Sequence, residues 1–262
     1  MMTQDWPRWG VVTDDTIRAL IGDPFGSWEL GEGLGRVEAA DLLAPTMPTK
    51  IVCVGLNYTA HADESSAEVP SEPLLFFKPP SAVIGPDASI VLPSQSERVD
   101  YEGELAIVIG RAQSGPCRHV SPDRAWDHVL GVTCGNDVTA RDLQSRDNQW
   151  TRAKGFDTFC PLGPWLMTGL GEEDVAELEV VCRVNEDVRQ DGHVSDMVFS
   201  PAELMAYVSS IMTLAPGDVI MTGTPEGVGP LAPGDKVEVR IEGVGELRNV
   251  AVGEGHTAKD MG

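Results

Sequence analysis

The sequence predicts an α+β fold in which strands predominate, preceded by a small N-terminal β domain. Its 28 Gly and 19 Pro residues are spread along the 262-residue chain and separate many short apolar runs, a pattern typical of strands. These runs are not separated by the regular helices that a doubly wound parallel sheet requires. Both observations disfavour a helical bundle and an alternating α/β fold.

The first 48 residues are expected to form the small β domain and a linker. The alternating run Trp9–Val12 is followed by a Gly- and Pro-rich stretch that ends at Leu43-Ala44-Pro45. The main domain is expected to begin near Thr49, so that it comprises residues 49–262.

Strands in the main domain are predicted where β-branched residues cluster between Gly, Pro, Asn or Asp residues. These runs are Ile51–Leu56, Glu104–Ile109, Val129–Cys134, Glu179–Val184, Asp218–Thr222, Lys236–Ile241 and Glu246–Val252. Short helices are predicted over Thr59–Ala67, Pro122–Trp126, Ala140–Gln144 and Pro201–Met212, the last with Ser200 as its N-cap. Residues 172–191 are strongly acidic, which predicts a solvent-exposed sheet edge protected by charge rather than a binding tail.

The net charge of −22 restricts the partners of this protein. A strongly negative surface repels phosphate backbones and anionic lipids, so neither nucleic-acid binding nor membrane binding is expected. No apolar run approaches the ~20 residues that cross a bilayer, and the start does not resemble a signal peptide, so a cytoplasmic protein is expected. The five cysteines never occur as Cys-x-x-Cys, which argues against a disulfide framework and a zinc site. A site for an anionic substrate must contain local positive charge.

Three carboxylates are candidate metal ligands. Glu102 and Glu104 lie at the start of an apolar strand, where alternation puts both on one face with Cα atoms ~6.6 Å apart. Their repulsion must be relieved by protonation or by a cation. Asp137 follows another predicted strand and offers a third carboxylate. Such an all-oxygen set suits Mg²⁺ or Mn²⁺, although Glu-x-Glu on a strand is more often a solvated face.

Further residues offer acid–base groups and positive charge. If the segment after Gly55 is helical, His61 and Glu64 are neighbours at i and i+3, a pair suited to proton abstraction, although such pairs are usually surface contacts. Lys154 lies among aromatic residues, and Arg141 and Gln144 share one face of a predicted helix. The Gly-rich residues 222–229, which include Thr224, form either a plain turn or a loop that offers N–H groups and a hydroxyl to a carboxylate.

Taken in order, five motifs resemble the fumarylacetoacetate hydrolase family. They are Gly-Leu-Asn-Tyr-x-x-His-x-x-Glu, Tyr-Glu-Gly-Glu-Leu, Asn-Asp-Val-Thr-Ala-Arg-Asp-x-Gln, Lys-Gly-Phe-Asp-Thr-Phe and Thr-Gly-Thr-Pro-x-Gly-Val-Gly, and the match spans roughly residues 49–252. The first ~48 residues resemble, more loosely, the N-terminal domain of bacterial isomerase-like and hydrolase-like members.

The resemblance implies a mixed β-sandwich roll, usually a homodimer. It implies Mg²⁺ or Mn²⁺ at Glu102, Glu104 and Asp137, and a lid that carries His61 and Glu64. It also implies that Lys154, Arg141, Gln144 and Thr224, with Lys78 as a further candidate, orient the carboxylate and oxo groups of the substrate.

The chemistry of these groups leaves three functions open. A 2-oxo or 2,4-dioxo acid chelates the metal, so negative charge that develops at C3 delocalises into an enolate. We favour hydrolysis of a C–C bond in an acylpyruvate- or fumarylpyruvate-like acid by a water that His61 and Glu64 activate, with Lys154 offsetting the oxyanion charge. The alternative is an isomerase or decarboxylase of a related diacid from aromatic catabolism, which needs no attacking water. A non-catalytic metal-binding β-sandwich is the distant alternative.

Overall fold

The computed structural model describes residues 7–64 and 67–256. The chain divides into two compact units, Met1–Leu42 and Leu43–Gly262, which are treated separately below. The division lies a few residues before the Thr49 boundary expected from the sequence.

The first unit is a three-stranded antiparallel sheet in the order β1-β2-β3. Its strands are β1 (Gly10–Thr13), β2 (Thr16–Gly22) and β3 (Trp28–Arg36), followed by the 3₁₀ helix η1 (Val37–Ala39). Asp14 and Asp15 form the β1–β2 turn with positive φ angles of 47° and 62°. A two-residue hairpin loop requires this conformation, and Asp tolerates it.

The second unit is built on a mixed seven-stranded sheet in the order β5-β4-β15-β9-β10-β12-β6. The strands are β5 (Leu74–Lys78), β4 (Ile51–Gly55), β15 (Val219–Met221), β9 (Gly103–Ile109), β10 (Val129–Asn136), β12 (Cys160–Met167) and β6 (Val83–Ile84). The pairs β15–β4 and β12–β6 are parallel, and the others are antiparallel. Buried residues of β9, among them Leu105 and Ile107, lie at the centre of the core.

A five-stranded sheet in the order β14-β13-β17-β18-β7 packs against β9, β10 and β12. Its strands are β14 (Asp187–His193), β13 (Glu179–Val184), β17 (Lys236–Ile241), β18 (Gly245–Gly253) and β7 (Ser89–Leu92). At Gly103 the two sheets approach so closely that an added Cβ would lie 3.0 Å from Cβ of Cys182. Glycine therefore allows β9 to pass over β13 at this point. A third, small sheet joins β11 (Thr139–Ala140), β8 (Val99–Tyr101) and β16 (Gly229–Pro230).

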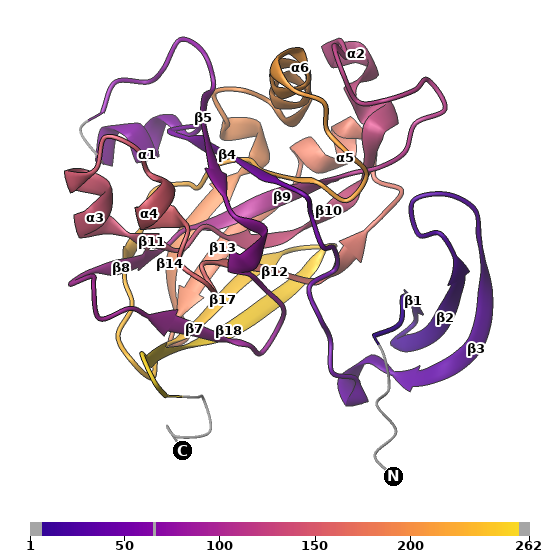
Figure 1. The fold of residues 1–262 in the computed structure, drawn as a ribbon, viewed down its shortest axis with the longest axis horizontal. Coiled ribbons are helices and arrows are strands. Elements are labelled where there is room, and N and C mark those ends of the chain that lie inside the picture. Colours follow the sequence, from indigo (N-terminus) through magenta and orange to yellow (C-terminus); the bar gives the residue numbers. More distant parts are fainter. Residues whose placement is uncertain (1–6, 65–66, 257–262) are drawn as a thin grey trace. The chain divides into compact units, whose positions relative to one another are not determined.

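The helices of this unit are short. They are α1 (Thr59–Glu64), α2 (Pro122–Ala125), α3 (Arg141–Arg146), α4 (Thr151–Lys154), α5 (Glu172–Ala176) and α6 (Pro201–Ile211), with 3₁₀ turns at Pro80–Ala82, Trp126–His128 and Val194–Asp196. Figure 1 shows α1, α3 and α4 gathered at one end of the sheets and α2 beside α6. Ser200 caps α6 in a reciprocal capping box with Glu203, as predicted for the N-cap.

The strand-dominated α+β class is confirmed, and each of the seven predicted strands is present with small shifts at its ends. The predicted helix over Thr59–Ala67 is observed as α1, and residues 65–66 lie outside the described residues. The acidic stretch begins with α5 and ends in β14, which is an edge strand as expected. All five cysteines are buried and free. Within the described ranges, no helix has the length and apolar character needed to cross a membrane.

Candidate metal centre and active site

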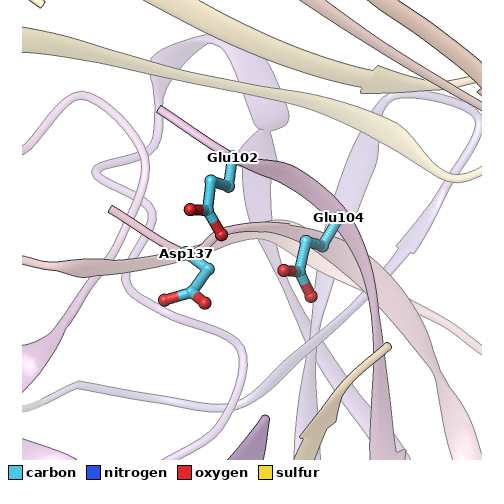
Figure 2. A group of neighbouring side chains, drawn as sticks. All are labelled: Glu102, Glu104 and Asp137. Atoms are coloured by element: carbon cyan, nitrogen blue, oxygen red, sulfur yellow. The ribbon is translucent and has the colours of Figure 1, made fainter. Parts of the chain in front are cut away.

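Three buried carboxylates converge at one end of β9. Glu102 directly precedes this strand and Glu104 is its second residue, so both side chains lie on one face. Antiparallel pairing with β10 aligns Gly135 with Glu104, and the N–H of Asp137 donates to the carbonyl of Glu102 at 2.8 Å. One oxygen from each carboxylate lies within 4.8 Å of the others. Figure 2 shows the resulting group, with Glu104 from β9, Glu102 from the residue before it and Asp137 from the segment after β10.

The compensating charge is distributed unevenly over this cluster. Glu102 accepts hydrogen bonds from Nζ of Lys154 (2.8 Å) and from a guanidinium nitrogen of Arg141 (2.6 Å). Asp137 accepts from Nζ of Lys154 (2.7 Å) and forms an ion pair with Lys78. Glu104 accepts a 2.8 Å bond from the N–H of Gly223, and no cation in the described part of the chain forms an ion pair with it. Glu104 is thus the carboxylate that lacks a counter-charge.

The pKa values of the two glutamates shift in opposite directions for this reason. Burial acts to raise the pKa of Glu102, but the charges of Lys154 and Arg141 outweigh it and hold that pKa well below its ordinary value. Burial, reinforced by the negative charges of Asp137 and Glu102, holds the pKa of Glu104 well above its ordinary value. The cluster consequently favours either a proton or a cation at Glu104.

A divalent cation fits this donor set. Three converging carboxylate oxygens without sulfur or imidazole match hard ions such as Mg²⁺ and Mn²⁺, and positive charge beside Glu104 would remove the repulsion described above. Glu102, Glu104 and Asp137 are the residues that would hold the ion.

The carboxylates lie in the wall of a cavity of about 260 Å³. Its polar wall includes His61 from α1 and Arg141, Gln144 and Ser145 from α3, together with Lys154 and Thr224. The remaining wall is largely apolar and consists of Val54, Gly55, Leu56, Ala67, Phe76 and Trp150. Trp150 packs directly over Gly55, where an added Cβ would lie 2.9 Å from the indole ring. Sequence reasoning did not single out Trp150, because its role depends on this contact between distant segments.

His61 and Glu64 form the expected pair on α1. Nδ1 of His61 lies 3.6 Å from a carboxylate oxygen of Glu64, and His61 is buried in the cavity wall. The two oxygens of Glu64 accept from the N–H of Gly227 at 3.1 and 3.3 Å. The pair therefore connects α1 to the loop after β15, beside the carboxylate cluster.

Comparison with known proteins agrees with this geometry. Residues 50–252 match the family described as fumarylacetoacetate (FAA) hydrolase C-terminal, and residues 2–45 match the family described as Rv2993c-like, N-terminal. The chain belongs to the fumarylacetoacetate hydrolase family. Members and homologues of this family are isomerases, tautomerases and hydrolases, and the chain is accordingly an enzyme.

Three proteins are similar to most of this chain. Protein Rv2993c of Mycobacterium tuberculosis is 47% identical over 253 residues, which cover 94% of this chain and 91% of that protein. The human mitochondrial oxaloacetate tautomerase FAHD2A is 46% identical over 228 residues, covering 84% of this chain and 71% of the relative. The crystal structure of 2-hydroxyhepta-2,4-diene-1,7-dioate isomerase from Mycobacterium marinum superimposes with a TM-score of 0.83 at 45% identity, covering 92% of this chain and 89% of the other.

The family resemblance implies that Lys154 and Arg141 bind the substrate. In this structure both side chains form ion pairs with protein carboxylates. Burial acts to lower the pKa of Lys154, but the negative charges of Asp137 and Glu102 outweigh this effect and hold that pKa above its ordinary value. Lys154 is therefore charged. Arg141 donates to Asp100 (2.9 Å) and to Oε1 of Gln144 (2.7 Å) besides Glu102. Sequence reasoning missed Asp100, which is fully buried and holds Arg141 at the cavity; its place two residues before Glu102 was the available signal.

Lys78 is not a cavity residue in this fumarylacetoacetate hydrolase family member. It is 1% exposed, and its ammonium group contacts Asp137 and the carbonyl of Val138, the latter at 3.0 Å. The residue ends β5, which is separated from β9 by the two strands β4 and β15, and its side chain reaches Asp137. Lys78 thus supports a candidate metal ligand, and the substrate contact expected for it stays a prediction.

Proposed function

We propose that this protein is a divalent-metal-dependent enzyme that moves a proton between carbon and oxygen of a 2-oxo acid, a keto–enol tautomerase or isomerase. The observation that carries this proposal is the composition of the cavity wall. Among the described lining residues, His61 is the single acid–base group outside the carboxylate cluster and its two cations. One base beside a cation site provides the groups that proton transfer next to a carbonyl requires.

The bound cation would supply a Lewis acid for the oxygen atoms of the 2-oxo acid group. Arg141 and Lys154 offset part of the charge of the three carboxylates, and a bound divalent cation would make the polar side of the cavity positive enough to admit an anion despite the acidic surface. In the enol-to-keto direction His61 takes the proton of the C2 hydroxyl and delivers it to C3, so that the O–H bond breaks, a C3–H bond forms and C2 becomes a carbonyl. In a 2-hydroxy-2,4-dienoic acid the same proton is delivered to the conjugated C5. Glu64 stabilises the imidazolium that forms, and the N–H of Gly227 fixes Glu64 in place.

Hydrolysis of an acylpyruvate-like 2,4-dioxo acid is the second candidate. The His61–Glu64 pair is suited to activating a water, which favours this reaction. Hydrolysis also requires positive charge for the oxyanion at C4. Lys154, which the sequence assigns to that task, donates to both Glu102 and Asp137, and no other cation besides Arg141 occurs among the described lining residues. Proton transfer does not require a cation beside C4, and neither does decarboxylation.

A substrate panel tests the proposal. Enzyme loaded with Mg²⁺ or Mn²⁺ is assayed for the enol-to-keto conversion of oxaloacetate, isomerisation of 2-hydroxy-2,4-dienedioates, decarboxylation of oxaloacetate and cleavage of acylpyruvates. We expect enol conversion or isomerisation without C–C cleavage, together with exchange of the C3 hydrogen in D₂O. Efficient acylpyruvate cleavage without such proton transfer would instead establish the hydrolase.

His61→Ala is the matched variant for the base. We expect kcat to fall by about 10²- to 10⁴-fold with unchanged metal content, because the carboxylate cluster is left intact. A rate near that of the wild type would exclude His61 as the base.

Two expectations from the sequence stay predictions. The homodimer implied by the family resemblance is tested by size-exclusion chromatography with light scattering. The cytoplasmic location is tested by cell fractionation.

A further inference from the structure

The side chain of Gln190 connects three backbone or side-chain groups around the cavity. Gln190 lies on the edge strand β14, 1% exposed. Its Oε1 accepts from the N–H of Gly103 (2.9 Å), between the two candidate ligands of β9. Its Nε2 donates to Oγ1 of Thr224 (2.7 Å) and to the carbonyl of Pro225 (2.8 Å). One buried amide thus joins the ligand strand to the loop that follows β15.

The orientation of this amide follows from its partners. A backbone N–H can only donate, so the atom facing Gly103 must be the oxygen of Gln190. A backbone carbonyl can only accept, so the atom facing Pro225 must be the nitrogen. The second hydrogen of that nitrogen is directed to Thr224, whose hydroxyl must therefore accept it.

The same logic fixes the hydroxyl hydrogen of Thr224. Oγ1 lies 2.9 Å from the carbonyl oxygen of Gly103, a group that can only accept. The hydroxyl hydrogen belongs to that bond, since otherwise two lone pairs would face each other at this distance. A hydroxyl has one hydrogen and two lone pairs, and Gln190 uses one of the lone pairs. Thr224 lies in the cavity wall, and its hydroxyl retains one lone pair that neither Gln190 nor Gly103 uses.

We propose that Gln190 and Gly103 set the Thr224 hydroxyl as an acceptor, so that the site selects ligands that present a hydroxyl donor there, such as an enol or a 2-hydroxy acid. Gln190 is a positioning residue in this scheme. A second carboxylate or an oxo group offers only lone pairs and gains no bond from this hydroxyl. The inference rests on the proposed tautomerase function and specifies which form of the substrate, the enol, the site recognises through Thr224.

Two small chelating probes separate the alternatives. Glycolate carries a carboxylate and a hydroxyl donor, whereas oxalate has the same carbon count and offers acceptors alone. Both are titrated calorimetrically into Mn²⁺-loaded wild type, Thr224→Val and Thr224→Ser. We expect Thr224→Val to weaken glycolate binding by about threefold to tenfold, the effect of one hydrogen bond, and to change oxalate binding by less. Thr224→Ser keeps the hydroxyl and should restore the glycolate-to-oxalate affinity ratio.

Gln190→Met tests the positioning residue, because it keeps the side-chain length and removes all three hydrogen bonds. The Gly103 carbonyl still takes the hydroxyl hydrogen in this variant, so the affinity ratio should fall only part of the way toward that of Thr224→Val, through looser placement of Thr224. A purely structural role would instead lower both affinities by the same factor. If Gln190→Met does not fold, the Thr224 variants decide alone.

The outcomes distinguish this inference from the proposed function. Weaker oxalate binding with unchanged glycolate binding in Thr224→Val would show that the hydroxyl donates, and an equal loss for both probes would show a structural role; either result overturns the inference while the proposed function stands. Failure of metal-loaded wild type to bind either probe would overturn both.

Discussion

The strand pair β9–β15 carries a buried carboxylate near each end, and the two differ in the donors that surround them. Asp218, directly before β15, is fully buried and accepts from the N–H groups of Thr49 (3.0 Å), Lys50 (3.1 Å) and Ala215 (2.7 Å). It also accepts from the Thr49 hydroxyl (2.6 Å) and pairs with the Lys50 ammonium group. Glu104, near the opposite end, accepts from Gly223 and faces two further carboxylates.

The difference separates a structural carboxylate from a functional one. Burial acts to raise the pKa of Asp218, but the hydrogen bonds from Lys50, Thr49 and Ala215 outweigh it and hold that pKa below its ordinary value. Asp218 is satisfied by the fold alone, and it joins the starts of the parallel strands β4 and β15. The raised pKa of Glu104 marks a carboxylate that the fold leaves unsatisfied.

The largest expected effect comes from Glu104→Gln. The amide oxygen can still accept from Gly223, but a ligand charge is lost, so kcat/KM should fall by about 10³-fold or more through lost metal binding. The melting temperature of the metal-free protein should stay the same or rise, because a buried repulsion is removed. Metal titration, kinetics and calorimetry measure these effects. Retained metal affinity would exclude Glu104 as a ligand.

Asp137→Asn should behave differently from Glu104→Gln, although both remove one charge from the same cluster. Repulsion among three carboxylates considered alone predicts that this variant stabilises the metal-free protein. The structure reverses the sign, because Asp137 pairs with the buried ammonium groups of Lys78 and Lys154. Removing one partner of a buried ion pair costs about 3–5 kcal/mol. A drop in the melting temperature of metal-free Asp137→Asn, absent in Glu104→Gln, would establish this distinction; equal melting temperatures would contradict it.

Asp218→Asn is the reciprocal variant at the opposite end. The amide nitrogen of the new side chain would face N–H groups that now donate hydrogen bonds to the carboxylate. The free energy of unfolding should therefore fall by about 2–4 kcal/mol. For a chain of this size the melting temperature should drop by about 5–15 °C. The metal affinity of the folded variant should match that of the wild type. A loss of metal affinity without a loss of stability would show that the two ends are not independent.

Local sequence patterns predicted the three carboxylates of the candidate metal centre. They did not predict the contacts that position these carboxylates and balance their charge. The alternation of a strand puts Glu102 and Glu104 on one face, and the place of Asp137 after another predicted strand suggested the third carboxylate, which the family resemblance also implied. The partner Lys78 lies 59 residues before Asp137, and Gln190 lies 87 residues after Gly103. Such contacts depend on the registers of several strands and on the packing of the two sheets, which no local pattern specifies.

Two of the strands that were not predicted, β12 and β14, have sequences that are not typical of strands. β12 contains Pro161, Gly163 and Pro164, residues that normally interrupt strands. β14 is polar because it is an edge strand with most side chains exposed, so it lacks an apolar pattern. The short helix α4, which carries Lys154, comprises four residues and has no recognisable cap.

The smallest effect is the pH dependence of stability and of metal affinity. It is also the sharpest test of the comparison between Glu104 and Asp218. A raised folded-state pKa means that Glu104 stabilises the metal-free protein below its unfolded-state pKa, and this contribution is lost as the pH rises through its folded-state pKa. The lowered pKa of Asp218 has the opposite sign: its contribution is present above its unfolded-state pKa and is lost as the pH falls through its folded-state pKa. Because a ligand must be deprotonated, Mg²⁺ binding below the pKa of Glu104 should release a proton, and affinity should rise by up to about tenfold per pH unit. Calorimetric titrations in buffers with different ionisation enthalpies count the protons released. Asp218→Asn should release as many protons as the wild type. Glu104→Gln, titrated at the higher Mg²⁺ concentration that its weakened affinity requires, should release fewer; equal proton release in all three proteins would assign the titration to another group.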